Sequence, residues 1–404
     1  MTPAPDVVVI GAGPSGLIAA ETLGAAGLGV MVCDRMPSVG RKLLMAGRGG
    51  LNLTHSEPLD SFLDRYGPTR ARLAPLIEAF PPEALRAWAG GLGQTTFVGP
   101  SGRVFPEAMK ASPLLRAWLA RLADLGVDLR TRWNWRGWDE HGALAFDTPD
   151  ERKTVRPAAV LLALGGASWP RLGSDGGWAG VLSAAGATVA PFRPANCGFD
   201  VAWTDAFAAR FQGQPLKNVA LDFGGRRARG DLVISRYGLE GGALYALSAP
   251  LRDAIEGSGR AVLGVDLRPD LTLEHIQRRL EQPRGGRSLS NHLRRSLRLA
   301  PVASNLIREA AGAALPTDAA ALAGFIKHAP ITLVGVQPLA RAISSAGGVA
   351  WTEVGPDLQL KALPGVYVAG EMLDWEAPTG GYLLQACFAS GVAAAKAVLA
   401  ARDG

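Results

Sequence analysis

The sequence lacks the side-chain patterns that would supply redox chemistry or metal binding by themselves. Its three cysteines, Cys33, Cys197 and Cys387, lie far apart and form no Cys-x-x-Cys pair, which argues against a disulfide framework and a dithiol centre. The five histidines are also widely separated, and none has metal-ligand spacing to another histidine or to a cysteine. Any redox chemistry must therefore rest on a cofactor, and no metal site is expected.

A long apolar run near the N-terminus is missing as well. The longest charge-free apolar stretch near the N-terminus, residues 7–20, is too short to span a bilayer, contains glycine and proline, and follows no basic segment. We therefore expect a soluble cytoplasmic protein without a membrane partner. The 404 residues are 48% apolar and include 51 glycines, which is typical of a large α/β enzyme with two or three domains.

The chain carries a modest excess of positive charge, with 42 Lys and Arg against 36 Asp and Glu. Arginines are densest at residues 226–229 and 278–298, where they could form a basic face for an anionic partner such as RNA. No aromatic residues are interleaved with them, so the sequence favours an ordinary solvated surface over a platform for stacking bases. Nucleic acid therefore stays an alternative partner.

The N-terminus carries the most informative motif, Gly-Ala-Gly-Pro-Ser-Gly at residues 11–16. An apolar strand is expected before it at residues 7–10, and an alanine-rich helix after it at residues 17–26. Strand, tight turn and helix occur in the order that a dinucleotide fingerprint needs. Gly11 permits the turn, Gly13 lets the backbone approach a pyrophosphate, and Gly16 lets the helix pack on the strand, so the helix N-terminus faces the phosphates.

A second apolar strand, expected at residues 28–33, ends at Asp34. The separation from Gly16 is close to the ~20 residues at which an acidic side chain binds a ribose hydroxyl. An NADP site would favour a basic residue at this position. Asp34 occupies the position itself, and the basic Arg35 lies next to it, so the sequence does not favour NADP. These features together predict dinucleotide binding.

The C-terminal region supplies a complementary half-site. An apolar strand at residues 365–369 ends in Gly370-Glu371, and Gly380-Gly381-Tyr382 opens a long helix. A carboxylate at a strand end can accept hydrogen bonds from ribityl hydroxyls. Backbone amides at a helix N-terminus favour an anionic, reduced flavin. Together the two half-sites predict FAD.

The order of elements predicts a doubly wound α/β domain interrupted by an insertion. Strands and helices alternate over residues 1–193, including a helix at 113–125 and a strand at 160–164, which precedes Gly165 and Gly166. Alternating strands follow at 197–203, 218–223, 231–235 and 261–267, so residues 194–336 read as a β-rich inserted domain. Residues 270–329 contain short amphipathic helices, and residues 337–404 complete the first domain.

Several further segments lie in a fixed order between the two half-sites. They are Gly40-Arg41-Lys42, the stretch from Gly47 to Thr54 with Asn52, Gly102-Arg103-Val-Phe-Pro106, Gly165-Gly166-Ala-Ser168-Trp-Pro170, and Ala346-Gly347-Gly348-Val349. With the two ends, this set resembles the YhiN/BaiN-like bacterial flavoproteins, often labelled NAD(P)/FAD-dependent or aminoacetone-oxidase-like. The resemblance runs over essentially the whole chain and implies a glutathione-reductase-like FAD domain with an inserted β-barrel-like domain that contains a helical part.

The motifs and the resemblance together assign a set of cofactor-binding residues. These are Gly11, Gly13, Pro14, Ser15, Gly16, Asp34, Arg35, Arg41, Lys42, Asn52, Trp135, Gly165, Gly166, Gly370, Glu371, Gly380, Gly381 and Tyr382. Two departures from the family pattern matter. Gly50-Leu51 stands where the family usually has Arg-Cys, and Leu383 stands where it usually has Asn, so chemistry that depends on that Cys or Asn is absent. A divergent subgroup with its own small-molecule substrate is expected.

No second Gly-x-Gly-x-x-Gly with a following strand occurs, so reducing equivalents must come from the substrate or from a transiently bound NAD(P)H. Two reactions fit: hydride removal from an amine or hydroxy compound with O2 as oxidant, or hydride delivery to an unsaturated substrate. Arg103, His55 and Tyr237 are the candidates for proton transfer or substrate anchoring. A flavoprotein that acts on RNA and a flavin-loaded sensor without turnover are the alternatives.

Overall fold

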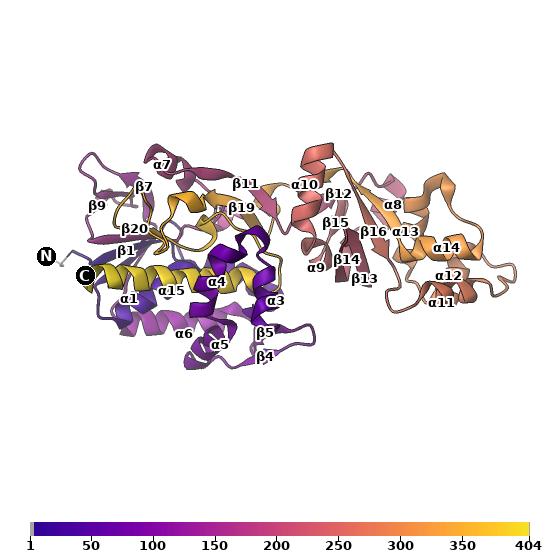
Figure 1. Cartoon of the computed structure of the whole chain (residues 1–404), viewed down its shortest axis with the longest axis horizontal. Helices are drawn as coiled ribbons and strands as arrows, with labels where there is room; N and C mark the ends of the chain where they lie inside the picture. The colour runs from indigo at the N-terminus through magenta and orange to yellow at the C-terminus, as the bar shows by residue number, and fades with distance from the viewer. Residues whose placement is uncertain (1–3, 404) are drawn as a thin grey trace. The chain divides into compact units, whose positions relative to one another are not determined.

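The computed structural model describes residues 4–403, apart from the side chains of residues 48 and 403, and the chain divides into two compact units (Figure 1). Met1–Arg193 and Ile343–Gly404 form the first unit, and Pro194–Ala342 forms the second, which we call the insert. The sequence predicted the return to the first unit at residue 337. The structure places it at Ile343, because Gln337 is hydrogen-bonded to Gly198 and Asp200 of the insert and Ala342 is buried in the core of the insert.

A five-stranded sheet forms the centre of the first unit, with the order β20-β10-β1-β2-β6 and every pair parallel. The strands are β1 Val7–Ile10, β2 Val30–Asp34, β6 Asp128–Thr131, β10 Ala159–Leu162 and β20 Val366–Val368. All four residues of β1 are buried, as expected for the central strand of a sheet covered on both faces. The order reverses at β1, so this strand marks the topological switch point where ligands bind in open α/β sheets.

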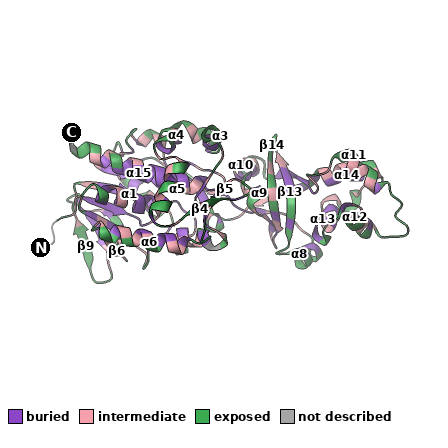
Figure 2. Ribbon diagram, turned by 90° about the horizontal axis from the view of Figure 1, so that it is seen from below, coloured by how far each residue is buried: buried purple, intermediate pink, exposed green. Residues whose placement is uncertain are grey.

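Helices cover this sheet, and the longest of them is α15. The helices of the first unit are α1 Pro14–Ala25, α2 Arg41–Ala46, α3 Leu59–Asp64, α4 Arg70–Ala79, α5 Pro82–Gly91, α6 Ala111–Asp124, α7 Trp178–Ala184 and α15 Tyr382–Asp403. In Figures 1 and 2, α15 runs alongside α1, and the two helices pack together. By length and composition α15 could cross a membrane, but 56% of its most apolar window is buried, as in a core helix.

Smaller sheets flank the main sheet. They are β3 Thr54–His55 with β5 Arg103–Pro106 and β4 Thr96–Val98, then β7 Asn134–Trp138 with β8 Leu144–Asp147 and β9 Arg152–Val155, and the ribbon of β11 Val189–Ala195 with β19 Ser344–Val349. The first of these places His55 directly opposite Arg103. Two predicted site residues that are far apart in the sequence therefore become cross-strand neighbours.

The insert is built on a seven-stranded antiparallel sheet with the order β17-β16-β13-β14-β15-β12-β18. Its strands are β12 Phe199–Asp200, β13 Pro215–Phe223, β14 Arg226–Ile234, β15 Gly238–Glu240, β16 Ala261–Asp266, β17 Ala329–Leu333 and β18 Gly335–Val336. Only Val334 separates β17 from β18, so one continuous segment pairs with both edges of the sheet and gives a barrel-like closure. The strand predicted at residues 197–203 is much shorter, because only Phe199 and Asp200 find partners.

Four helices make up the helical part of the insert: α11 Leu273–Leu280, α12 Leu289–Leu297, α13 Pro301–Ala311 and α14 Ala319–Lys327. Three others, α8 Asp205–Phe211, α9 Gly242–Tyr245 and α10 Ser248–Ser258, lie elsewhere in the insert. Four apolar side chains of α11 and α12 are buried in the core of the insert: Ile276, Leu280, Leu293 and Leu297. Their polar faces are therefore left to solvent.

Candidate functional site

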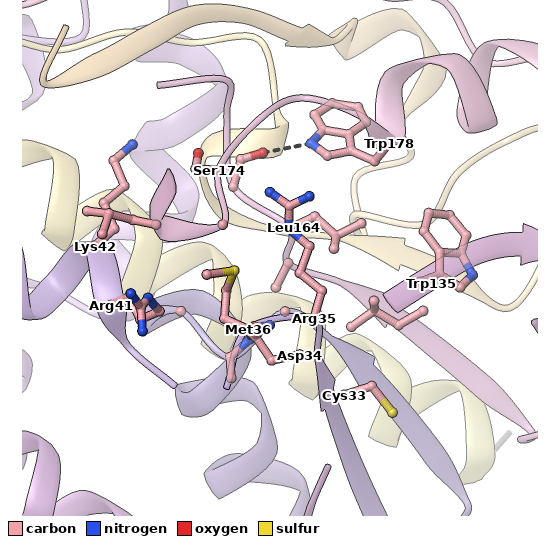
Figure 3. A pocket seen from close by; sticks show the side chains of 18 of the residues that line it. Cys33, Asp34, Arg35, Met36, Arg41, Lys42, Trp135, Leu164, Ser174 and Trp178 are labelled. Carbon is pink, nitrogen blue, oxygen red and sulfur yellow. Dashed lines mark hydrogen bonds between the residues drawn. The ribbon is translucent and has the colours of Figure 1, made fainter. Parts of the chain in front are cut away.

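A cleft of about 410 Å³ opens in the first unit at the carboxyl ends of β1, β2 and β10. Its wall includes Gly11 and Gly13 after β1, Asp34 at the end of β2, and Leu164 and Gly165 after β10. Figure 3 shows Lys42 and Arg41 toward one end of the cleft and Trp135 toward the other, with Asp34 between them. This is the expected place for a dinucleotide in an open α/β sheet, and an elongated ligand would fit it.

The N-terminus of α1 faces this cleft without a capping side chain. Gly13 is the N-cap residue and Pro14 opens the helix, and no acidic residue occurs in the first turn. The first backbone N–H groups of a helix have no partner within it, and together with the helix dipole they favour an anion. A Cβ built on Gly13 would meet no protein atom within 4 Å, so this side of the backbone is open to a ligand. The geometry fits a pyrophosphate.

Two backbone amides hold the carboxylate of Asp34 in place at the end of β2. Its Oδ2 accepts from Ala12 N and its Oδ1 from Met36 N, both at 2.8 Å. Burial raises the pKa of this carboxyl above its ordinary value, although these two hydrogen bonds act in the opposite direction. Each oxygen still has acceptor capacity for a hydroxyl group.

An ion pair between Lys42 and Glu371 lines the same cleft. Lys42 Nζ lies 2.8 Å from Glu371 Oε2 and donates to Ser168 Oγ at 2.7 Å. The other carboxylate oxygen, Oε1, accepts from Ser345 N at 2.9 Å. The Glu371 side chain is only 12% exposed, so this carboxylate needs its partners. The sequence assigned Lys42 and Glu371 to the cofactor separately, and the structure joins them.

Several buried polar atoms on the cleft wall have no partner in the described part of the chain. Arg41 Nε and Trp135 Nε1 are two of them, and both residues line the cleft. Buried polar groups normally find a hydrogen-bond partner, so these atoms fit a polar ligand. Cys387 also lines the cleft, and burial raises the pKa of its thiol to about 12. It therefore remains a neutral thiol rather than a nucleophile.

Eleven of the eighteen residues that the sequence assigns to the cofactor line this cleft: Gly11, Gly13, Pro14, Ser15, Asp34, Arg35, Arg41, Lys42, Trp135, Gly165 and Glu371. The other seven do not line it: Gly16, Asn52, Gly166, Gly370, Gly380, Gly381 and Tyr382. Among these, several glycines permit close approaches within the protein. A Cβ at Gly370 would lie 2.2 Å from Ser15 Oγ, and one at Gly381 would lie 2.5 Å from the Thr54 backbone.

Sequence reasoning missed several residues of the cleft wall, including Met36, Ser38, Ser174 and Trp178. Trp178 Nε1 donates to Gly165 O at 2.9 Å and so holds the glycine turn after β10. Ser174 Oγ donates to Gly166 O at 3.0 Å. The only available signal for these two was their position a few residues after the paired glycines, because no motif specifies them.

Near the start of α15, Tyr382 is the centre of a cluster of polar and aromatic side chains. Its hydroxyl donates to Glu57 Oε1 at 2.6 Å, and its ring stacks on His55 with centroids 5.5 Å apart. Arg65 binds the same carboxylate through two nitrogens, at 3.1 and 2.6 Å. Burial, with the Glu57 hydrogen bond and charge, raises the pKa of the Tyr382 hydroxyl, whereas the charge of Arg103 lowers it. The tyrosine therefore keeps its proton.

The three residues that the sequence proposes for catalysis have different surroundings. Both ring nitrogens of His55 are used, since Nε2 lies 2.9 Å from Ser101 O and Nδ1 accepts from Glu57 N at 3.1 Å. Proton transfer by His55 would require one of these bonds to break. Arg103 has no ion pair among the residues that the structure describes. Tyr237 belongs to the insert, where its hydroxyl bonds to Glu240.

Replacing Glu57 by glutamine is expected to lower the free energy of unfolding of the apoprotein by about 1 kcal/mol at neutral pH. The neutral amide has one acceptor oxygen and cannot accept both hydrogen bonds from the guanidinium group of the half-exposed Arg65. Burial alone would raise the pKa of Glu57, but the hydrogen bonds from Arg65 and Tyr382 outweigh it and lower the pKa. A lowered carboxyl pKa stabilises the fold above the unfolded pKa, and this stabilisation is lost as the pH falls through the folded pKa.

Urea unfolding at a series of pH values checks this expectation. The difference between the wild-type protein and Glu57→Gln should shrink as the pH falls below the ordinary glutamate pKa of 4.5. Glu151→Gln is the matched control, because Glu151 forms its ion pair with Lys153 on the surface and surface pairs contribute little. Equal effects of the two substitutions would contradict a special role for Glu57.

The fold and the cleft define a class, the FAD-dependent oxidoreductases with a Rossmann-like domain and an insertion. Within this class, the chain belongs to the HI0933-like family, because the sequence profile of the HI0933-like protein Rossmann domain matches residues 5–397. This confirms the family, fold class and cofactor that the sequence predicted.

Comparison with known proteins agrees with this assignment. The chain is 24% identical to a 3-dehydro-bile acid delta(4,6)-reductase of Clostridium scindens, over 96% of this chain and 98% of the relative. It is 23% identical to a ribosomal RNA dihydrouridine synthase of Haemophilus influenzae, over 97% and 98%. The fold is similar to that of 3-ketosteroid delta1-dehydrogenase from Sterolibacterium denitrificans, with a TM-score of 0.55, 13% identity, and coverage of 98% and 99%.

Proposed function

We propose that this flavoprotein is a reductase that adds hydrogen across a carbon–carbon double bond conjugated with a carbonyl group of a small molecule. The observation that carries the proposal is the cleft at the switch point of the sheet, which combines an uncapped helix N-terminus, Asp34 and the Lys42–Glu371 pair. The direction of the reaction is supported by the names of two relatives, a delta(4,6)-reductase and a dihydrouridine synthase. Both names describe the gain of hydrogen at a double bond.

The chain's own residues would hold the cofactor and prepare the substrate. FAD, with its pyrophosphate at the first turn of α1 and a ribose at Asp34, would supply the hydride to one carbon of the double bond. Solvent water would supply the proton to the other carbon. Lys42 and Glu371 would bind its polar chain between the two ends. Arg103, a cation without an ion pair among the described residues, would polarise the carbonyl oxygen of the substrate.

His55 and Tyr382 would position this arginine rather than transfer the proton themselves. His55 lies opposite Arg103 on the neighbouring strand and is fixed by its bonds to Ser101 and Glu57. Tyr382 holds the other side of the histidine ring. The role of Tyr237 in proton transfer or substrate anchoring stays a prediction.

A second candidate substrate is a uracil base within RNA, whose reactive double bond is also conjugated with a carbonyl group. The Haemophilus influenzae relative supports it, and so does the excess of positive charge on the insert. The chemical step would be the same as for the small molecule, so the two candidates differ only in how the substrate is bound.

We also propose a cytoplasmic location. All three cysteines are free and two are buried, which suits a reducing compartment. A reducing compartment would also provide the nicotinamide that the reaction needs.

Anaerobic titration of the purified protein with NADH and NADPH tests the proposal. One of the two nucleotides is expected to bleach the visible absorption band of the flavin within seconds to minutes, and an α,β-unsaturated ketone is expected to restore the band. Bleaching by neither nucleotide, with reoxidation by O2 after reduction by an amine or alcohol, would contradict a reductase and favour the oxidase reaction. A colourless protein that takes up no added FAD would contradict the assignment of the cleft.

A further inference from the structure

The net positive charge of this protein comes from the insert. Residues 194–342 carry 19 Lys and Arg against 13 Asp and Glu, a net charge of 19 − 13 = +6. The rest of the chain carries 23 of each sign, so its net charge is zero and the +6 of the whole chain comes from the insert alone. Electrostatic attraction to an anionic partner would therefore act through the insert.

Most of this excess lies in one short segment. Residues 271–300 contain seven arginines and two glutamates, a net charge of 7 − 2 = +5. The segment comprises α11, α12 and the loop between them, and every residue of 281–288 is exposed (Figure 2). Six of the seven arginines are exposed to solvent, and we call them the arginine surface: Arg278, Arg284, Arg287, Arg294, Arg295 and Arg298.

This surface differs from the other arginine-rich segment, at residues 226–229. There, Arg227 pairs with Asp222 and with the buried Asp266, and Arg229 pairs with Asp270. No member of the arginine surface has an ion pair among residues 4–403. The arginines at residues 226–229 are therefore largely neutralised within the fold, whereas the arginine surface keeps its charge for a partner.

The arginine surface also has a defined shape. Arg287, Asn291, Arg294 and Arg295 line a hollow of about 410 Å³. On the opposite face of α12, His292 and Leu293 are buried, and His292 Nε2 lies 3.1 Å from Leu280 O. The helix that carries the arginines is thus fixed to the core of the insert, and its guanidinium groups point away from that core.

Three kinds of anionic partner could match such a surface, and its composition separates them. Residues 271–300 contain no Phe, Tyr or Trp, so single-stranded bases would find no aromatic platform. Among the apolar side chains of α11 and α12 only Leu273 is exposed, and the others pack against the core of the insert, so the segment lacks a continuous apolar face to insert into a membrane. The phosphate backbone of a double helix remains, because guanidinium groups bind phosphates in a bidentate manner without base contacts.

We propose that the arginine surface is a docking site for the phosphate backbone of double-helical RNA. The loop and short helix that carry it suit recognition by shape, which is how proteins bind double-stranded RNA. The choice of RNA over DNA rests on the second candidate function, whereas the binding itself is independent of the redox reaction.

Fluorescence anisotropy with a labelled RNA duplex of about 16 base pairs, the length that a double-stranded RNA-binding domain spans, tests the proposal. The probe is titrated with the full-length, oxidised holoprotein at several salt concentrations, without nicotinamide. We expect binding that weakens as salt rises. The triple variant R287E/R294E/R295E should weaken binding at low salt at least about tenfold and reduce the salt slope by about three, one for each lost phosphate contact. R287K/R294K/R295K, which keeps the charge, should retain most of the binding.

The matched control is R72E/R116E/R152E, which changes the same amount of charge at exposed arginines of the first unit. It should bind RNA within about twofold of the wild-type protein. Circular dichroism and flavin content check that each variant is folded. Absence of binding by the wild-type protein at low salt, equal losses in both triple variants, or preference for a DNA duplex or for acidic lipid vesicles would each overturn the proposal. Because no reductant is present, failure of the reductase proposal would leave this result unaffected.

Discussion

Replacing Gly13 by alanine is expected to remove FAD from the purified protein while leaving the apoprotein folded. Gly13 has φ −87° and ψ −176°, a conformation that alanine adopts freely, and its Cβ would meet no protein atom within 4 Å. The new methyl group would instead fill the space where a pyrophosphate approaches the backbone. We expect FAD affinity to fall at least about tenfold, or ~1.4 kcal/mol, and the stability of the apoprotein to stay the same or rise slightly.

Gly16→Ala provides the contrast. A Cβ at Gly16 would lie 1.9 Å from Gly11 O, so the strand and helix would have to separate, at a cost of about 1–3 kcal/mol or more. This variant should lose both FAD and stability. FAD content from the visible spectrum, FAD affinity from flavin fluorescence, and thermal unfolding of the apoproteins distinguish the two variants. If Gly13→Ala kept full FAD affinity, the pyrophosphate could not lie against α1.

Replacing Lys42 by methionine is expected to destabilise the apoprotein by about 1–3 kcal/mol. The substitution leaves the Glu371 carboxylate, only 12% exposed, with the backbone and hydroxyl of Ser345 as its remaining partners. Breaking a fully buried pair costs about 3–5 kcal/mol, and the 28% exposure of Lys42 reduces the effect here. Urea unfolding of the apoprotein measures the change, and FAD binding should weaken in parallel.

The double variant K42M/E371Q completes a thermodynamic cycle. Because it removes both charges, it should recover part of the stability that Lys42→Met loses. Glu371→Gln alone should cost less than Lys42→Met, since the unpaired Lys42 is more exposed to solvent than the unpaired Glu371 carboxylate, and the amide oxygen can still accept one of the two hydrogen bonds. Additive effects of the two single substitutions would mean that the pair has no coupling energy, which would contradict a stabilising ion pair between Lys42 and Glu371.

Much of the first unit follows from short-range sequence signals. β1 has the bounds predicted from its apolar run, and β2 ends at Asp34 as expected, because apolar periodicity and the following turn residues are local features. The strand predicted at residues 197–203 was wrong for the opposite reason. Its length depends on partners in β15 and β18, and a sequence pattern does not say where such partners end.

In the candidate site, too, local features could be predicted from the sequence and long-range contacts could not. The glycines after β1 and the acid after β2 were identifiable because the dinucleotide fingerprint is contained in about 30 consecutive residues. Two long-range contacts could not be identified from the sequence. They are the ion pair of Lys42 with Glu371, 329 residues apart, and the hydrogen bond of Tyr382 to Glu57. Nothing in the local sequence requires these particular side chains to meet.

By itself, the sequence determined the fold class, the cofactor and the interruption of one domain by another, since each depends on the order of local elements. Only the tertiary structure decided which charges remain available. Arg227 and Arg229 are neutralised by acids brought beside them by the sheet, whereas the arginines of α12 are not paired in the described chain. The physical reason is that electrostatic interaction depends on distances in space, which are set by packing between segments remote in the sequence.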